Sequence, residues 1–180
     1  MQKLNARDRL KVIGWSEPHP EKQFFASNVR DEIAFGPENQ GLSGEEIEQR
    51  IAWAMQLVDL EAGYYLARDP RSLSGGEKRR VALASIIAYQ TPFYIFDEPT
   101  AGLDYCGRSS FLELIGRLRT EGCGVVWITH TINFLQNVTD RIWGMEKGRL
   151  MFDSLTAEVD WEVLTNLLEN GRSFSEINKG

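Results

Sequence analysis

The segment RSLSGGEKRRVAL, residues 71–83, places a helix-capping serine before two adjacent glycines. Ser74 is a favourable N-cap residue, and Glu77 three positions later completes a capping box. Gly75 and Gly76 remove side chains where the first amide groups of the helix emerge. These amides, the Ser74 hydroxyl and the positive end of the helix macrodipole suit a terminal phosphate. By themselves the residues leave open the alternative of an ordinary capped helix after a flexible loop.

Two short apolar runs end in side chains that could do chemistry. FYIF, residues 93–96, precedes Asp97 and Glu98, and VVWIT, residues 125–129, precedes His130. Neither run alternates between apolar and polar residues, which predicts strands buried on both faces of a parallel sheet. Ligands of open α/β sheets bind outside the carboxyl ends of the strands, so these side chains are expected to converge. Taken singly, a simple turn and a structural histidine are the alternatives.

Other segments must position these groups. Ser43 and Glu46 form a second capping box, which opens a helix expected to end near Gly63. The predicted apolar face of that helix consists of Ile47, Ile51, Ala54, Met55 and Val58. The remaining predicted elements are a strand at 9–16, the helix after Ser74 running to about Gln90, helices near 107–119 and 132–138, a hairpin turning at Lys147 and Gly148, and a helical tail after Ser154.

Composition bounds the class of protein. A chain of 180 residues with 42% hydrophobic content is expected to form one main globular unit. The net charge of -6 argues against a nucleic-acid partner, and we interpret the cluster Lys78, Arg79 and Arg80 as a solvated helix face. No apolar run approaches the roughly 18 to 20 residues that span a bilayer. Any membrane role is therefore expected to come through a partner.

Three motifs together resemble a known family. LSGGEKRR (73–80), FYIFDEPTAGLD (93–104) and WITH (127–130) resemble the signature motif, the Walker B strand with D-loop, and the switch histidine of ATP-binding-cassette (ABC) ATPases. Residues 20–39 are similar to the ATPase subunits of energy-coupling-factor transporters, which import vitamins and transition-metal ions. The resemblance covers about residues 9–153. It implies an α/β fold, an incomplete P-loop NTPase (ABC ATPase) core with a helical subdomain.

The resemblance also implies a division of the chain and a set of roles. Residues 1–23 and 91–153 would be parts of the core sheet, 24–90 the helical and signature subdomain, and 154–180 a C-terminal helical tail. ATP and Mg²⁺ would be the cofactors. The implied roles are Mg²⁺ binding by Asp97, activation of the attacking water by Glu98, contact with the γ-phosphate by His130, a bridge between two ATPase subunits by Asp104, and contact with a partner subunit's nucleotide by Ser74, Gly75, Gly76 and Glu77.

Two kinds of partner follow from the resemblance. A second ABC ATPase subunit would complete a homodimer or heterodimer. A transmembrane transporter subunit would insert a short helix near Phe24, Phe25 and Asn28, for which ordinary core packing of the two phenylalanines is the alternative. The chain would then be a cytoplasmic protein held at the inner face of the membrane. Because a separate membrane component selects the substrate in such transporters, no substrate or direction of transport is implied.

The sequence departs from the family pattern in several places. The Walker A loop, G-x-x-x-x-G-K-S/T, occurs nowhere in the 180 residues, and residues 4–16 resemble the segment well after that loop. We therefore expect a portion of a longer ATPase, or a chain completed by another. The Q-loop glutamine position holds Pro18, where Glu17 could substitute, whereas Gln23 matches another family position. Thr131 replaces the aspartate that often follows the switch histidine.

Three functions stay open at this level. The first is the ATP-hydrolysing subunit of a transporter of the energy-coupling-factor type. A non-catalytic pairing subunit that lends its LSGGE signature to a partner's ATP is the second. The third, an ABC ATPase of DNA repair or chromosome structure, ranks last because coiled-coil insertions and a basic surface are absent from the sequence. The chain alone is expected neither to bind nor to hydrolyse ATP.

Overall fold

The computed structural model describes residues 9, 11–132 and 135–169, which fall into two compact units. The first unit runs to Thr129 and the second begins at His130. The predicted boundaries after residues 23, 90 and 153 remain predictions.

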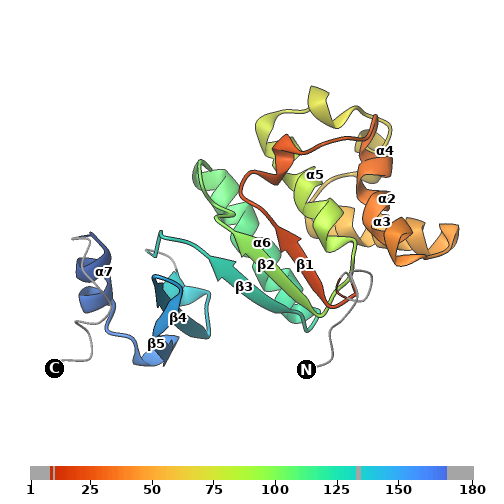
Figure 1. Cartoon of the computed structure of the whole chain (residues 1–180). Helices are drawn as coiled ribbons and strands as arrows, with labels where there is room; N and C mark the ends of the chain where they lie inside the picture. The colour runs from red at the N-terminus through yellow and green to blue at the C-terminus, as the bar shows by residue number, and fades with distance from the viewer. Residues whose placement is uncertain (1–8, 10, 133–134, 170–180) are drawn as a thin grey trace. The chain divides into compact units, whose positions relative to one another are not determined.

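The first unit is built on a three-stranded parallel sheet in the order β1-β2-β3 (Figure 1). Its strands are β1 Ile13–Ser16, β2 Phe93–Asp97 and β3 Gly124–Ile128. Phe93 pairs with both Ile13 and Gly124, so the three strands begin at one level. The predicted parallel sheet is confirmed, although β1 is shorter than the strand predicted at 9–16.

The helices of the first unit begin at clear capping signals. They are α2 Val29–Gln40, α3 Gly44–Leu57, α4 Ala62–Tyr65, α5 Gly75–Ile87 and α6 Tyr105–Thr120. Short 3-10 turns cover Pro20–Lys22 (η1) and Pro70–Ser72 (η2). The expectation that the helix after Ser43 reaches Gly63 is wrong, because Asp59 adopts a left-handed backbone with φ of 53°. The sequence analysis also did not identify α2, whose interior contains Pro37.

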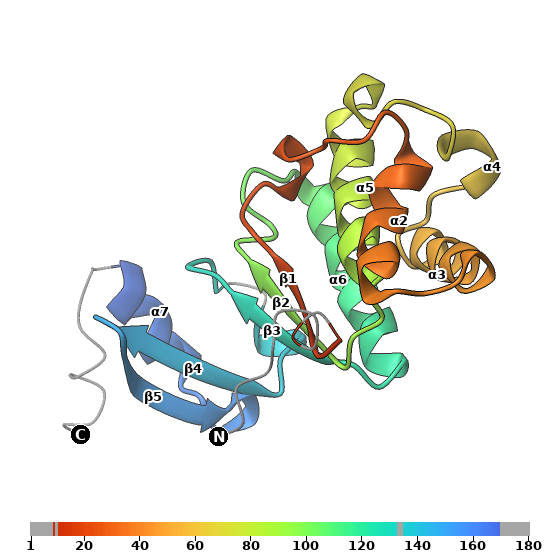
Figure 2. The same cartoon turned by 45° about the vertical axis from the view of Figure 1, so that its right-hand side comes forward.

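The apolar core lies on one face of this sheet. Tyr94 and Phe96 are fully buried, and the Tyr94 hydroxyl donates a 3.0 Å hydrogen bond to the carbonyl of Ile87 in α5. The Phe96 ring packs edge-on against Phe111 of α6, with 5.4 Å between centroids. Both helices therefore cover the same face of the sheet (Figure 2).

The opposite face of the sheet is open in the first unit. Trp15 is 58% exposed and Phe93 52% exposed, and Ile13 and Ile128 are also exposed. The prediction that the apolar strands are buried on both faces is thus wrong for this unit. Apolar composition alone does not distinguish a strand with two covered faces from a strand whose second face lacks a helix.

The second unit carries an antiparallel hairpin and a helix. Its elements are η3 Leu135–Asn137, β4 Arg141–Glu146, β5 Arg149–Leu155, η4 Thr156–Glu158 and α7 Trp161–Glu169. Lys147 and Gly148 form the turn with φ of 49° and 75°, which confirms the predicted hairpin. In place of the helix predicted near 132–138, the described residues form only the 3-10 turn η3. Residues 133–134 of that prediction lie outside the described ranges.

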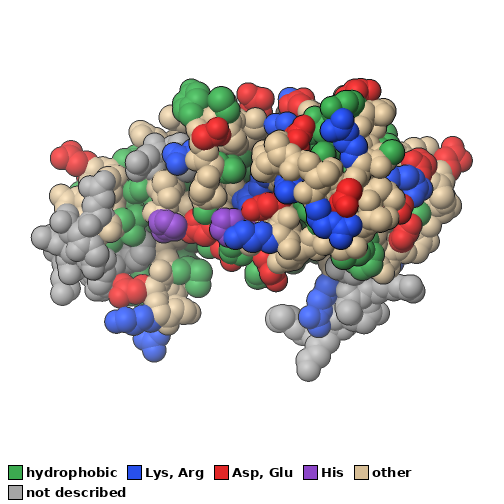
Figure 3. Space-filling view, turned by 90° about the horizontal axis from the view of Figure 1, so that it is seen from above, with side chains coloured by type: hydrophobic (Ala, Val, Ile, Leu, Met, Phe, Trp, Pro, Cys, Tyr) green, Lys and Arg blue, Asp and Glu red, His purple; other side chains and the backbone are tan. Residues whose placement is uncertain are grey.

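The lengths of the helices and the distribution of surface charge bear on the kinds of partner that the chain could have. The longest described helix, α6, has 16 residues, and none within the described ranges has the length and hydropathy needed to cross a bilayer. On the face drawn in Figure 3, Lys and Arg side chains are interspersed with Asp and Glu side chains.

Candidate functional site

The N-terminus of α5 has the capping geometry predicted from the sequence. The Ser74 amide donates a 2.8 Å hydrogen bond to Oε2 of Glu77. In return, the Glu77 amide donates to the Ser74 hydroxyl oxygen over 3.4 Å. This reciprocal pair satisfies two of the amides that a helix start leaves without intrahelical partners, and it sets the direction in which α5 begins.

Gly75 and Gly76 leave open space at this helix end. Both residues are exposed, and a Cβ atom built at either position would meet no atom within 4 Å. Neither glycine has a positive φ, so the backbone does not require glycine at these positions. Within the described residues, therefore, neither packing nor conformation explains the two glycines. The arrangement leaves backbone amides accessible to an anion at the positive end of the helix.

Glu77 is held from a second direction by Tyr65, which the sequence analysis did not single out. The Tyr65 hydroxyl donates a 2.8 Å hydrogen bond to Oε1 of Glu77. The hydrogen bonds from Ser74, and then the bond from Tyr65, lower the pKa of Glu77 to about 2. Glu77 is thus ionised at neutral pH, and its carboxylate connects α5 to α4. No spacing rule in the sequence marks Tyr65 for this contact.

The acidic pair lies at the carboxyl end of β2, as predicted. Asp97 and Glu98 are both half-buried, and Asp97 is in register with Ile128 of β3. The Glu98 amide donates a 2.9 Å hydrogen bond to the Ile128 carbonyl, and the Thr129 hydroxyl lies 3.4 Å from Oε2 of Glu98. Glu98 also has a left-handed backbone with φ of 44°. Such strain in a non-glycine residue is typical of functional sites and persists only where neighbouring contacts maintain it.

His130 and Asp104 lie in different surroundings. His130 is exposed and is the first residue of the second unit, directly after Thr129. Asp104 is exposed at the N-cap of α6, where its Oδ1 accepts a 2.8 Å hydrogen bond from the Gly107 amide. This capping bond uses one carboxylate oxygen of Asp104. The predicted role of Asp104 as a bridge between subunits stays a prediction.

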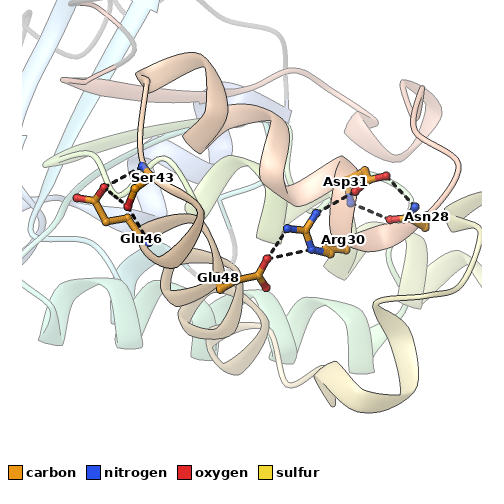
Figure 4. Close-up of polar contacts among 6 residues, drawn as sticks. All are labelled: Asn28, Arg30, Asp31, Ser43, Glu46 and Glu48. Atoms are coloured by element: carbon orange, nitrogen blue, oxygen red, sulfur yellow. Dashed lines mark hydrogen bonds and ion pairs between the residues drawn. The ribbon is translucent and has the colours of Figure 1, made fainter.

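The two phenylalanines of the predicted partner groove differ in how far they are buried. Phe24 packs against the hydrophobic core, as the alternative interpretation expected, whereas Phe25 is 59% exposed. The Phe25 ring meets the ring of Phe35 edge-on, with centroids 4.7 Å apart. Asn28 caps α2 by accepting a 2.9 Å hydrogen bond from the Asp31 amide (Figure 4). Phe35, half-exposed beside Phe25, was not identified from the sequence.

Side-chain hydrogen bonds hold the segment between β1 and α2 in place. Gln23 donates a 2.9 Å hydrogen bond to Oε2 of Glu17, so the two residues considered for the Q-loop role contact each other. Further along, the Phe25 and Ala26 amides both donate to Oε2 of Glu32, over 3.1 and 3.0 Å. The buried carboxylate of Glu32 therefore fixes the chain where it enters α2.

The basic cluster of α5 is not a solvated face, contrary to the sequence-based interpretation. Arg79 is only 5% exposed, and Lys78 and Arg80 are half-buried. Arg79 forms an ion pair with Glu21 over 2.7 Å. The burial reverses the prediction because a distant carboxylate, 58 residues earlier in the chain, supplies the compensating charge.

Comparisons with known proteins identify the family of the chain. The family model for ABC transporters matches residues 2–101. An energy-coupling factor transporter ATP-binding protein of Clostridium perfringens is 38% identical over 91% of this chain and 58% of its own length. A protein of the same description from Methanocaldococcus jannaschii is 36% identical over 86% of this chain and 55% of its own length. The chain thus spans less than two thirds of the length of these relatives.

Solved structures show the same relationship. The structure of cbiO1 from Clostridium perfringens, described as part of the ABC transporter complex cbiONQ, superposes with a TM-score of 0.72. It is 29% identical and covers 88% of this chain, which in turn covers 63% of that protein. Fold, sequence similarity and the arrangement of the signature and acidic motifs agree. The chain belongs to the ATP-binding-cassette transporter family of ATPase domains.

Proposed function

We propose that this chain is part of the ATP-binding and ATP-hydrolysing subunit of an energy-coupling-factor-type transporter, with its α5 N-terminus serving a partner subunit's ATP. The observation that carries the proposal is the open end of α5. Gly75 and Gly76 face open space and satisfy no requirement of their own backbone. An anion-binding role in trans supplies the missing reason, since a phosphate could approach the helix amides closely.

The acidic pair supports the hydrolytic part of the proposal. Glu98, held against the end of β3 by the Ile128 carbonyl, has a carboxylate suited to orient and deprotonate water. Asp97 offers the neighbouring carboxylate for a metal ion. We assign the γ-phosphate contact to His130, which follows β3 directly after Thr129.

The available ligands are consistent with Mg²⁺ bound together with nucleotide. Among the described residues, no group of three His, Cys, Asp or Glu side chains is placed to hold a metal ion. In the proposed site, Asp97 would be the carboxylate that this chain provides. Mg²⁺ commonly takes one or two carboxylates and fills its remaining positions with water and phosphate oxygens. Bound there, it would neutralise negative charge on the phosphates.

Two partners complete the proposal. A second ABC ATPase subunit would present its ATP to Ser74, Gly75, Gly76 and Glu77, with Asp104 at the interface between subunits. A transmembrane subunit would dock beside Phe25, whose exposed ring pair with Phe35 gives that surface an apolar character. Through this contact the chain would lie at the cytoplasmic side of the membrane.

The test separates the signature end from the acidic pair. This chain is mixed with a Walker A-bearing ABC ATPase subunit that binds but does not hydrolyse ATP, and dimer formation is measured by sedimentation with and without ATP. Gly76→Asp should abolish ATP-dependent association, because its carboxylate occupies the position that phosphate must approach. Glu98→Gln should leave that association nearly unchanged. Equal loss from both substitutions, or no ATP-dependent association of the unmodified chain, contradicts the trans role.

Hydrolysis distinguishes the ATPase from a non-catalytic pairing subunit. In the assembled transporter ATPase, Glu98→Gln should lower the hydrolysis rate by about 100-fold or more, the contribution expected of a general base. Phosphate release would be measured at saturating ATP, with Glu113→Gln, a substitution in α6, as the control. A rate unchanged by Glu98→Gln alongside intact association would favour the pairing subunit.

A further inference from the structure

Arg79 joins three segments that are distant in sequence. It lies in the first turns of α5, and its side chain is 7% exposed. One terminal nitrogen donates a 2.7 Å hydrogen bond to Oε2 of Glu21 in η1. The other donates to the backbone carbonyl of Pro99, the residue directly after Glu98. The guanidinium therefore ties the signature helix both to the loop after β1 and to the turn that carries Glu98.

The turn that Arg79 contacts has a strained backbone. Glu98 has φ of 44°, in the left-handed region that non-glycine residues rarely occupy. Its conformation is maintained on one side by the bond from its amide to Ile128, and within the turn by the Ala101 amide, which donates to the Glu98 carbonyl over 3.1 Å. Arg79 adds a further contact, from α5 to the Pro99 carbonyl. Strained residues persist where contacts from several directions maintain them.

Arginine suits this place for a geometric reason. Its planar guanidinium presents donors in a rigid fork, so it can reach a carboxylate and a carbonyl in different directions at once. A lysine ammonium is a compact charge on a flexible stem and is not preorganised to span both acceptors. Burial by itself would raise the pKa of Glu21, but the hydrogen bond from Arg79 and further contacts lower it overall. Glu21 is thus an ionised partner that orients the fork.

We infer that Arg79 is a positioning residue for Glu98: by binding the Pro99 carbonyl, with Glu21 as its anchor, it holds the turn in which Glu98 meets its substrate water. The inference rests on the proposed function of Glu98 as the general base. It also gives α5 two tasks, because the helix that presents Gly75 and Gly76 at its start supports the acidic turn one helical turn later. An arginine on a solvated helix face, as the sequence analysis interpreted Arg79, would not make this contact with Pro99.

Amide hydrogen exchange on the chain by itself tests the structural half of this inference. The variant is Arg79→Met with Glu21→Gln, which avoids leaving a buried carboxylate without its partner. Exchange of the Glu98, Ala101 and Leu103 amides should accelerate by about tenfold or more, as expected when a contact that restrains local opening is lost. Amides inside α3 should exchange at the unmodified rate.

A matched control exists elsewhere in the first unit. Arg117 of α6 likewise spans a carboxylate and a carbonyl, since it pairs with Asp59 and donates a 2.9 Å hydrogen bond to the Leu57 carbonyl. Arg117→Met with Asp59→Asn should leave exchange in the Glu98 turn unchanged. Unchanged exchange there in the Arg79 variant, or equal acceleration in α3, overturns the inference. If the double variant does not fold, Arg79→Lys, which keeps the charge beside Glu21, should still accelerate exchange in the turn.

Kinetics in the assembled ATPase test the functional half. The Arg79→Met, Glu21→Gln variant should lower kcat by about tenfold or more while KM for ATP stays within about twofold, because a base is displaced and no nucleotide contact is removed. Loss of protection in the turn with unchanged kcat overturns the positioning role. Failure of the proposed function would appear differently, as unchanged hydrolysis in Glu98→Gln, and in that case the positioning role falls with it whatever the exchange rates show.

Discussion

Two helices of the first unit begin with nearly the same four residues and nearly the same geometry. α3 starts with Ser43, Gly44, Glu45 and Glu46, and α5 with Ser74, Gly75, Gly76 and Glu77. The serine amide donates to the glutamate carboxylate over 2.9 Å in α3, shown in Figure 4, and over 2.8 Å in α5. An added Cβ would meet nothing at Gly44 or at Gly75. The cap itself is therefore the same in both helices.

The two helix ends differ in the charge they present. The second helical position is Glu45 in α3 and Gly76 in α5, so the first turn of α3 carries one more carboxylate than the first turn of α5. In α5, Tyr65 also draws the remaining glutamate toward α4 through its bond to Oε1 of Glu77. A capping box thus explains why a helix starts. The second glycine and the contact with Tyr65 distinguish the proposed phosphate site of α5 from the simple helix start of α3.

The largest expected difference comes from placing an acid at equivalent first positions. Gly75→Asp should eliminate ATP-dependent association with the Walker A-bearing subunit, whereas Gly44→Asp should leave it unchanged. Neither should destabilise the chain, because an acid in the first turn stabilises a helix by about 0.3 to 1 kcal/mol. Sedimentation with ATP measures the association of each variant, and thermal unfolding measures its stability. Similar association of the two variants would break the distinction between the helix ends.

Removal of the capping hydroxyls should affect both helices alike. Ser43→Ala and Ser74→Ala should each lower the free energy of unfolding by about 1 kcal/mol, the usual cost of losing a serine N-cap. Chemical denaturation of the two variants measures this. Costs that differ by more than about 1 kcal/mol would show that the two caps are not equivalent in energy.

The pH dependence of stability should separate the two capping glutamates. The pKa of Glu77 falls from 4.5 to about 2 on folding, so its contribution is fully present above pH 4.5 and is lost as the pH falls toward 2. Glu77→Gln should therefore destabilise the chain most at neutral pH, and the difference should shrink below pH 4.5 and be lost as the pH falls through 2. The pKa of Glu46 is also lowered, by hydrogen bonds from Ser43, without a contact like that from Tyr65. Denaturation at several pH values should show that the destabilisation caused by Glu46→Gln is lost over a narrower range of pH than that caused by Glu77→Gln.

The smallest expected effect concerns Tyr65 alone. Tyr65→Phe removes the hydroxyl that donates to Glu77 and should raise the pKa of Glu77 while keeping it below the ordinary value, since the Ser74 bonds remain. The pKa of Glu46 should not change. Carbon-13 NMR titration of the two carboxyl groups measures both, and a Glu77 pKa unaffected by the substitution would assign its depression to the cap alone.

Local patterns were sufficient to predict much of this protein. The starts of α3 at Ser43 and of α5 at Ser74, the strands predicted at 93–96 and 125–129, and the turn at Lys147 are all confirmed to within a residue. Each depends on residues within a few positions of one another, because caps, turns and apolar runs act over one or two helical turns or a single strand. The order of three motifs along the chain was enough to indicate the family.

Tertiary structure alone decided the features that need a distant partner. Arg79 is buried where Glu21 and the Pro99 carbonyl accept its hydrogen bonds, and Tyr65 of α4 donates to Glu77 at the start of α5. The sheet has one covered face because α5 and α6 both lie against Tyr94 and Phe96. Side-chain type and spacing record what a segment can do locally. Burial and pairing depend on which segments the folded chain brings together, and that information lies in the packing of the whole unit.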